Sequence, residues 1–172
     1  DLSALGKPLC FALSGALRVL ERPQRDRGAP PQGRALFIQL SEMGSPVLAS
    51  AAFLRLKELL PGEHCFAIFE RNAASLRLLG LFEDEKIFTF PDESLAPLAA
   101  ATGRFAAFCR RMQIEVVVDM ELFSRVSSVL SMISGARTRV GFHNYDGEGL
   151  YRGEHLTHPV NYNPYLHMSQ NF

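Results

Sequence analysis

The chain has 172 residues, of which 47% are hydrophobic and 21% are charged, enough for one domain with a well-buried core. Eighteen basic residues balance eighteen acidic ones, so no overall field favours nucleic acid, and we expect no nucleic-acid partner. Cys10, Cys65 and Cys109 lie far apart in the sequence, without the close pairs typical of metal sites or disulfide frameworks. A reducing compartment is the simpler interpretation.

Residues 1–33 differ from the rest of the chain. An apolar helix is expected over about 8–21, followed by the linker "RPQRDRGAPPQGR", which is rich in Pro, Gly and Arg. We find no cleavable signal pattern, and the longest apolar stretch, Pro8 to Leu17, is well short of the roughly 20 residues that span a bilayer. Two interpretations stay open: residues 8–27 lie on an anionic membrane surface, or the helix packs on an apolar protein surface. In either case we expect a cytoplasmic protein, free or attached to the inner face of the membrane.

From residue 35 onward, strand and helix patterns alternate. Apolar runs predict strands over 35–40, 65–69 and 86–90, and apolar residues at helical spacing predict helices over 46–60, 73–79 and 95–111. The first of these helices is expected to stop at Pro61-Gly62. The run of valines within 115–119 is typical of a central parallel strand that is covered on both faces.

A helix over 123–134, ending at Gly135, and a strand over 138–142 complete the pattern. This alternation predicts an α/β fold, an open parallel sheet with helices on both faces, in which ligands bind at the carboxyl ends of the strands. Residues 143–172 are loop-like and show no strand pattern. Near their end, Asn163-Pro164 is expected to begin a helix, as its N-cap and first helical residue.

The turn after the first strand, "LSEMGSPVL", has a structural and a functional interpretation. Gly44 suits a positive φ, Ser45 is a favoured N-cap and Pro46 is a favoured first helical residue. In the functional interpretation, Glu42 or Ser45 meets a substrate hydroxyl or phosphate at the helix N-terminus. The glycine spacing matches neither a dinucleotide-binding fingerprint nor a P-loop, so nicotinamide and nucleoside triphosphate enzymes lose support.

A second charged group follows the valine strand, in the segment "VVVDMELFSR". Asp119 and Glu121 stand at the end of this strand and Arg125 lies one turn into the next helix, so all three are expected to face the same crevice as Glu42. A structural ion pair, with Asp119 or Ser124 as the helix cap, explains these residues at least as well.

After the last predicted strand, histidines and tyrosines accumulate. His143, His155 and His158 lack the spacing of a zinc site, and we expect no metal. The tyrosines offer flat stacking faces beside hydrogen-bond donors, a mixture that suits sugars. The alternative is a surface loop that packs these rings on the edge of the sheet. The tyrosines are Tyr145, Tyr151, Tyr162 and Tyr165.

Taken together, the turn "LSEMGSPVL" and the segments "VVVDMELFSR", "SGARTRVGF" and "YNPYLH" resemble the amino-terminal half of the ADP-heptose:lipopolysaccharide heptosyltransferases, glycosyltransferase family 9. The resemblance covers about residues 34–172 and implies a GT-B architecture, in which two Rossmann-like domains face each other across a cleft. It also implies inverting sugar transfer without a further cofactor. Residues 34–172 would be the acceptor-side domain. The carboxy-terminal domain, its partner, would bind an ADP-heptose-like nucleotide-sugar donor and is absent from this chain, which would therefore be inactive alone.

The resemblance also raises the question of the catalytic base. Family members usually carry Gly-Asp in this turn, with the aspartate as the proposed base that deprotonates the acceptor hydroxyl, whereas this chain has Gly44-Ser45. A serine hydroxyl needs a proton acceptor of its own. Either Glu42 or another carboxylate such as Glu121 is the base, or the acceptor or chemistry differs, or catalysis has been lost. We favour Glu42, since it lies in the same turn as Ser45.

The acceptor implied by the resemblance is a lipopolysaccharide-core sugar or another lipid-linked cell-envelope saccharide. Arginines suit its anionic groups, because their planar fork donates two hydrogen bonds at once. The competing interpretation is a non-catalytic saccharide-binding or interaction module that has kept the fold and lost the base. The expected substrate contacts are Gly44, Asp119, Glu121, Arg125, Arg139, His143, Tyr151, Arg152, Tyr162 and Asn163.

Overall fold

A single parallel sheet organises the chain. The computed structural model describes residues 33–92, 95–122, 124–143 and 154–172, and in these residues six strands pair in the order β3-β2-β1-β4-β5-β6. All five pairings are parallel, which confirms the predicted open sheet. The strands are β1 (Ala35–Ile38), β2 (His64–Phe69), β3 (Ile87–Phe90), β4 (Val116–Asp119), β5 (Thr138–His143) and β6 (His158–Asn161).

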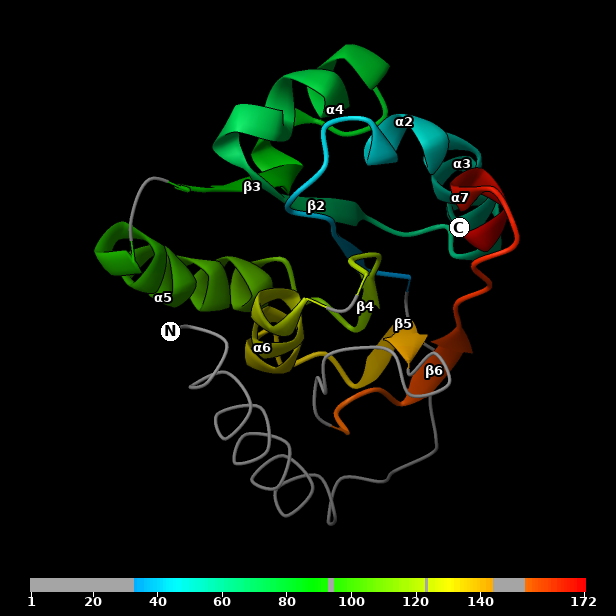
Figure 1. Cartoon of the computed structure of the whole chain (residues 1–172). Coiled ribbons are helices and arrows are strands. Elements are labelled where there is room, and N and C mark those ends of the chain that lie inside the picture. The colour runs from blue at the N-terminus through cyan, green and yellow to red at the C-terminus, as the bar shows by residue number, and fades with distance from the viewer. Residues whose placement is uncertain (1–32, 93–94, 123, 144–153) are drawn as a thin grey trace.

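Helices cover both faces of this sheet (Figure 1). The long helix α5 (Leu95–Arg111) and α6 (Arg125–Ile133) lie on one face, and α3 (Ser50–Leu59) and α4 (Ala73–Leu79) lie on the other, each where its apolar side chains are buried. Two helices of four residues, α2 (Ser45–Leu48) and α7 (Met168–Asn171), are on the α3 side, and the 3₁₀ turns η2 (Glu70–Asn72) and η3 (Asp84–Lys86) precede α4 and β3.

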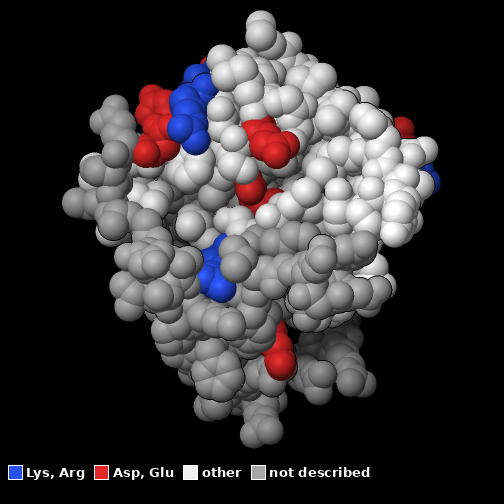
Figure 2. Space-filling model, viewed as in Figure 1, with Lys and Arg blue, Asp and Glu red and all other residues white. Residues whose placement is uncertain are grey.

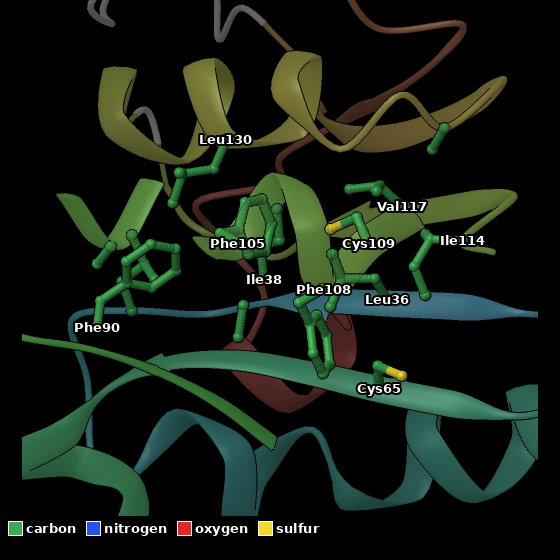
Figure 3. Packing of buried hydrophobic residues seen from close by; sticks show 14 residues of the cluster. Leu36, Ile38, Cys65, Phe90, Phe105, Phe108, Cys109, Ile114, Val117 and Leu130 are labelled. Carbon is green, nitrogen blue, oxygen red and sulfur yellow. The ribbon is translucent and has the colours of Figure 1, made fainter. Parts of the chain in front are cut away.

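The core on the α5 and α6 side is built from alternate residues of the central strands. Leu36 and Val117 pack there against Phe105 of α5, and Figure 3 shows the cluster around them. Two cysteines belong to this cluster, and burial raises the pKa of Cys65 to about 11 and that of Cys109 to about 12. Both thiols are therefore protonated at neutral pH and act as small apolar side chains.

The core on the opposite face is aromatic. The ring of Phe53, from α3, lies 4.7 Å from Phe37 and 5.5 Å from both Phe66 and Phe82, measured between ring centroids. All three contacts are edge-to-face, the arrangement that aromatic quadrupoles favour. Since Leu36 belongs to the other core, successive residues of β1 alternate between the two faces.

The helix expected over 46–60 and its cap differ from the prediction. The helix is interrupted at Ala49 (ψ −1°), so α2 and α3 are separate. Gly44 has φ −83° rather than a positive φ, and Ser45 is the first residue of α2 rather than a side-chain cap. By contrast, Ser124 caps α6 as considered, since its Oγ accepts a hydrogen bond from Ser127 N at 3.4 Å.

The carboxy-terminal segment also differs. The strand β6 was not predicted, because all four of its residues are exposed and they include Pro159, so its sequence has no buried face. Asn163 does not begin a helix: its Oδ1 accepts a hydrogen bond from Tyr165 N at 3.0 Å in a local turn. The helix α7 begins later, where His167 and Gln170 form a capping box.

The predicted helix over 8–21, the membrane contact through 8–27, Tyr145, Tyr151 and Arg152 lie outside the described residues. Within the part of the chain that the structure describes, no helix has the length and apolar character needed to cross a membrane.

We expect Phe53→Ala to lower the free energy of unfolding by about 3–5 kcal/mol, because it leaves a cavity among three phenylalanine rings. Urea denaturation followed by circular dichroism measures this loss. The control is Leu54→Ala, one residue along, where the side chain is 51% exposed and a change within about 1 kcal/mol is expected. Equal losses in the two variants would contradict this packing.

Candidate functional site

The candidate site lies at the carboxyl ends of β1 and β4, the two central strands. These strands are neighbours, with Ile38 paired to Asp119 at their ends. The chain leaves β1 toward β2 on one side and leaves β4 toward β5 on the other, so the two connections diverge and open a crevice between them. Figure 2 shows acidic side chains near the centre of the face seen in Figure 1.

The buried side chain of Glu121 connects the two strand ends. Its Oε1 accepts hydrogen bonds from the backbone N of Leu40 at 2.5 Å and of Ser41 at 2.7 Å. The hydroxyl of Ser41 also donates, at 2.9 Å to Oε1 and 2.8 Å to Oε2. Glu121 is 6% exposed. These contacts give Glu121 a structural role, in fixing the start of the β1–α2 turn, rather than the open position that a base or a substrate contact needs.

Asp119 is buried more deeply than Glu121, with 1% of its surface exposed. Its Oδ1 accepts a hydrogen bond from Glu121 N at 3.1 Å, and its Oδ2 accepts one from Ser127 Oγ at 2.9 Å. Asp119 thus ties the β4–α6 turn to the first turn of α6. Both carboxylate oxygens therefore have structural partners, and Ser124 rather than Asp119 caps α6.

Asn72 holds the same turn from the other side, and the sequence analysis did not identify it. Its side chain is 5% exposed, and Nδ2 donates a hydrogen bond to the carbonyl oxygen of Leu40 at 2.7 Å. In the sequence this residue lies directly before the predicted helix over 73–79, and in the structure it directly precedes α4. Leu40 is therefore held through its N–H by Glu121 and through its carbonyl by Asn72.

Glu42 differs from the two buried carboxylates because its side chain is exposed. Its Oε2 accepts a short hydrogen bond, 2.5 Å, from the hydroxyl of Ser45, which is 2% exposed. The serine hydroxyl thus restricts the rotamers of Glu42 and brings its carboxylate beside position 45. Among Glu42, Asp119 and Glu121, Glu42 alone combines an oriented carboxylate with access to solvent.

A small cavity of about 70 Å³ adjoins this turn. Its polar lining comes from the end of β1 and from the two turns, and its apolar lining comes from the β4–α6 turn and the end of the chain. The lining residues are, on the polar side, Gln39, Ser41, Glu42 and Glu121 and, on the apolar side, Met120, Leu122, Met168 and Phe172. Gln39 is a second residue that the sequence analysis missed, although a glutamine inside the apolar run "ALFIQL" was the available signal.

The side chain of Arg139 is buried and bonded within the fold, so it is not accessible to a ligand. It is 2% exposed, its Nε donates to the carbonyl of His155 at 2.7 Å, and its Nη1 donates to the carbonyl of Ala136 at 2.6 Å. These bonds hold the segment before β6 against β5. Arg139 therefore supports the fold, and the anion-binding role expected for it does not fit this position.

The remaining predicted contacts are dispersed. Gly44 directly precedes α2 and Arg125 is the first residue of α6, while His143 ends β5 and is half-buried. The ring of Tyr162 lies 5.7 Å from that of Phe142, as in the packing alternative. Asn163 is bonded within the terminal turn, its N–H donating to Asn171 Oδ1 at 2.9 Å.

Among the described residues, no group of three or more His, Cys, Asp or Glu side chains is placed to hold a metal ion.

No protein-family model and no curated protein matches the sequence significantly. Solved structures match its fold: a family 9 glycosyl transferase from Veillonella parvula DSM 2008 gives a TM-score of 0.64 at 11% identity, over 80% of this chain and 38% of that one. The fold is that of family 9 glycosyltransferase structures. The E. coli heptosyltransferase WaaC with ADP gives 0.62 at 16% identity, over 80% and 44% of the two chains. WaaC with ADP-2-deoxy-2-fluoro heptose gives 0.58 at 17% identity, over 80% and 45%.

This chain therefore spans less than half the length of each of these three structures. The matched structures confirm the Rossmann-like α/β fold that the sequence resemblance implies.

We expect Glu121→Gln to lower the free energy of unfolding by about 1.5–3 kcal/mol, because it replaces charge-assisted hydrogen bonds to Leu40 and Ser41. Amide hydrogen exchange at these two residues should accelerate as well. The control is Glu58→Gln, whose carboxylate is 66% exposed and pairs with Arg55 on the surface, where a change within about 0.5 kcal/mol is expected. Unchanged exchange at Leu40 and Ser41 would contradict the role of Glu121.

Proposed function

We propose that this chain is the acceptor-side domain of an inverting glycosyltransferase, which transfers a heptose or another sugar from a nucleotide donor to a lipopolysaccharide-core or other cell-envelope saccharide. The observation that carries the proposal is the exposed carboxylate of Glu42, oriented by the buried Ser45 at the carboxyl end of β1. The fold shared with family 9 glycosyltransferase structures supports the same class of reaction.

In the proposed reaction Glu42 is the general base. Its carboxylate takes the proton from an acceptor hydroxyl while that oxygen forms a bond to the anomeric carbon of the donor sugar. The bond from the anomeric carbon to the nucleotide diphosphate breaks, and its electron pair leaves with the diphosphate. Attack from the side opposite the leaving group inverts the anomeric centre. Ser45 donates a hydrogen bond to Glu42 and so positions the base without accepting the proton itself.

The position of Glu42 supports one answer to the question that the Gly44-Ser45 pair raises. Family members usually carry an aspartate where this chain has Ser45, and here the Ser45 hydroxyl lies 2.5 Å from a carboxylate oxygen of Glu42. A carboxylate is thus present beside position 45, supplied from three residues earlier. This arrangement favours a displaced base over a lost one.

The proposal places the donor on a second, carboxy-terminal domain outside this chain, and WaaC, solved with ADP and with an ADP-heptose analogue, supports a nucleotide sugar. Arg125, at the first turn of α6, is assigned to an anionic group of the acceptor because a guanidinium binds phosphate with two hydrogen bonds. A cytoplasmic location, with peripheral membrane contact through residues 8–27, belongs to the same proposal.

We expect Glu42→Gln in the full-length protein to lower kcat for sugar transfer by about 10²–10⁴-fold, because the amide cannot accept the hydroxyl proton. The KM values for donor and acceptor should change little. The measurement uses a panel of nucleotide sugars with a membrane-lipid extract as acceptor. Glu58→Gln, a charge-neutralising change on the exposed surface of α3, is the matched control and should retain wild-type kcat.

Transfer at the wild-type rate by Glu42→Gln would show that Glu42 is not the base. Saccharide binding without transfer by the wild-type protein would instead favour the non-catalytic binding module, for which Ser45 in place of an aspartate is the evidence.

A further inference from the structure

Gln39 places an amide in a buried position at the end of β1. Its backbone N donates a hydrogen bond to Ala67 O at 3.1 Å, which continues the β1–β2 pairing by one residue. By alternation its side chain lies on the same face as Phe37, toward α3 and the chain end. Gln39 is 3% exposed, and its Oε1 is buried without a hydrogen bond from any residue that the structure describes.

A buried polar atom without a hydrogen-bond partner is an exception among the side chains at this turn. The other buried polar side chains at the turn have partners, since Asn72 donates to Leu40 and Glu121 accepts from Ser41. Buried polar groups are hydrogen-bonded in most native proteins, so an unmatched carbonyl facing a cavity points to an occupant that donates. Of the described residues with an unmatched buried atom, Gln39 is the one that lines the cavity beside Glu42.

The cavity lining indicates the chemistry of the occupant. The carboxylate of Glu42 and the carbonyl of Gln39 both accept hydrogen bonds, so together they form a wall that binds donors. The apolar part of the lining, from Met168 and Phe172 among others, suits carbon-bound hydrogens. The edge of a sugar ring carries both hydroxyl donors and carbon-bound hydrogens, so it matches both parts of the lining. The volume, about 70 Å³, fits one substituted edge of a ring rather than a whole saccharide.

We propose that Gln39 is a specificity-determining residue, whose Oε1 accepts a hydrogen bond from a second hydroxyl of the acceptor, adjacent to the hydroxyl that Glu42 deprotonates. This inference rests on the proposed function and deepens it, because it names the acceptor class as a saccharide with two neighbouring hydroxyl groups. The hydrogen bond to Gln39 fixes the sugar edge in the cavity, so that the reacting hydroxyl faces Glu42. Gln39 recognises the substrate and takes no part in proton transfer.

The test uses Gln39→Met, which keeps the length of the side chain and removes the carbonyl. The probe is the saccharide fraction released from the native membrane, titrated by isothermal calorimetry into the full-length protein without donor. We expect the affinity to fall about tenfold or more, while the unfolding temperature of the free protein stays the same or rises, because a buried unmatched polar atom has been removed. Gln113→Met, at the opposite end of the sheet, is the control and should bind like the wild-type protein.

Wild-type affinity in Gln39→Met, or no binding of the saccharide by the wild-type protein, overturns the inference. If Gln39→Met unfolds at a markedly lower temperature, Gln39→Asn is measured instead: its shorter amide should also weaken binding, and unchanged affinity again overturns the inference. Saccharide binding that depends on Gln39, in a protein that transfers no sugar, leaves the recognition role intact and removes the proposed transferase.

Discussion

The side chain of Glu121 joins the ends of the two central strands, because it accepts hydrogen bonds from the backbone amides of Leu40 and Ser41 across the sheet. Asp119 fixes the backbone of Glu121, and Asn72 holds the carbonyl of Leu40 from the opposite side. The turn that carries the candidate base therefore starts from a point held by three buried side chains. Positional precision of this kind is what general acid–base chemistry requires of its supporting residues.

The hydrogen bonds that fix the end of β1 also distinguish the roles of the three acidic residues. Two carboxylates are buried and occupied with backbone or side-chain donors, and one, Glu42, remains exposed with a single orienting partner, Ser45. A flexible loop without such support would leave the position of its catalytic carboxylate poorly defined. Here the rigid strand end beneath the turn limits where Glu42 and the neighbouring Gln39 can lie, so the proposed proton transfer and the proposed recognition of the acceptor share one support.

Periodicity and composition predicted most of the sheet. The valine run of β4 and the bounds of α4 and α5 follow from strong local signals, and parallel topology brings the residues that follow β1 and β4 to one edge. The sequence could not predict β6, whose exposed residues depend on pairing with β5, nor the break at Ala49, which involves neither Gly nor Pro. The sequence placed the acidic residues at the ends of two strands that are neighbours in the sheet, but it could not rank their exposure, since burial depends on the turns that meet there. Gln39 lies within the predicted strand over 35–40 and Asn72 just outside the predicted helix over 73–79, and neither position signals a role at the turn.

The central claim is that the catalytic carboxylate has moved from position 45 to position 42 within one turn. The most direct test is the single-turnover rate of sugar transfer by Glu42→Gln and by the double variant Glu42→Gln/Ser45→Asp, with unfolding transitions to show that both are folded. The account predicts that the double variant transfers sugar at least about tenfold faster than Glu42→Gln, because a carboxylate again faces the acceptor hydroxyl. A folded double variant no faster than Glu42→Gln would contradict it.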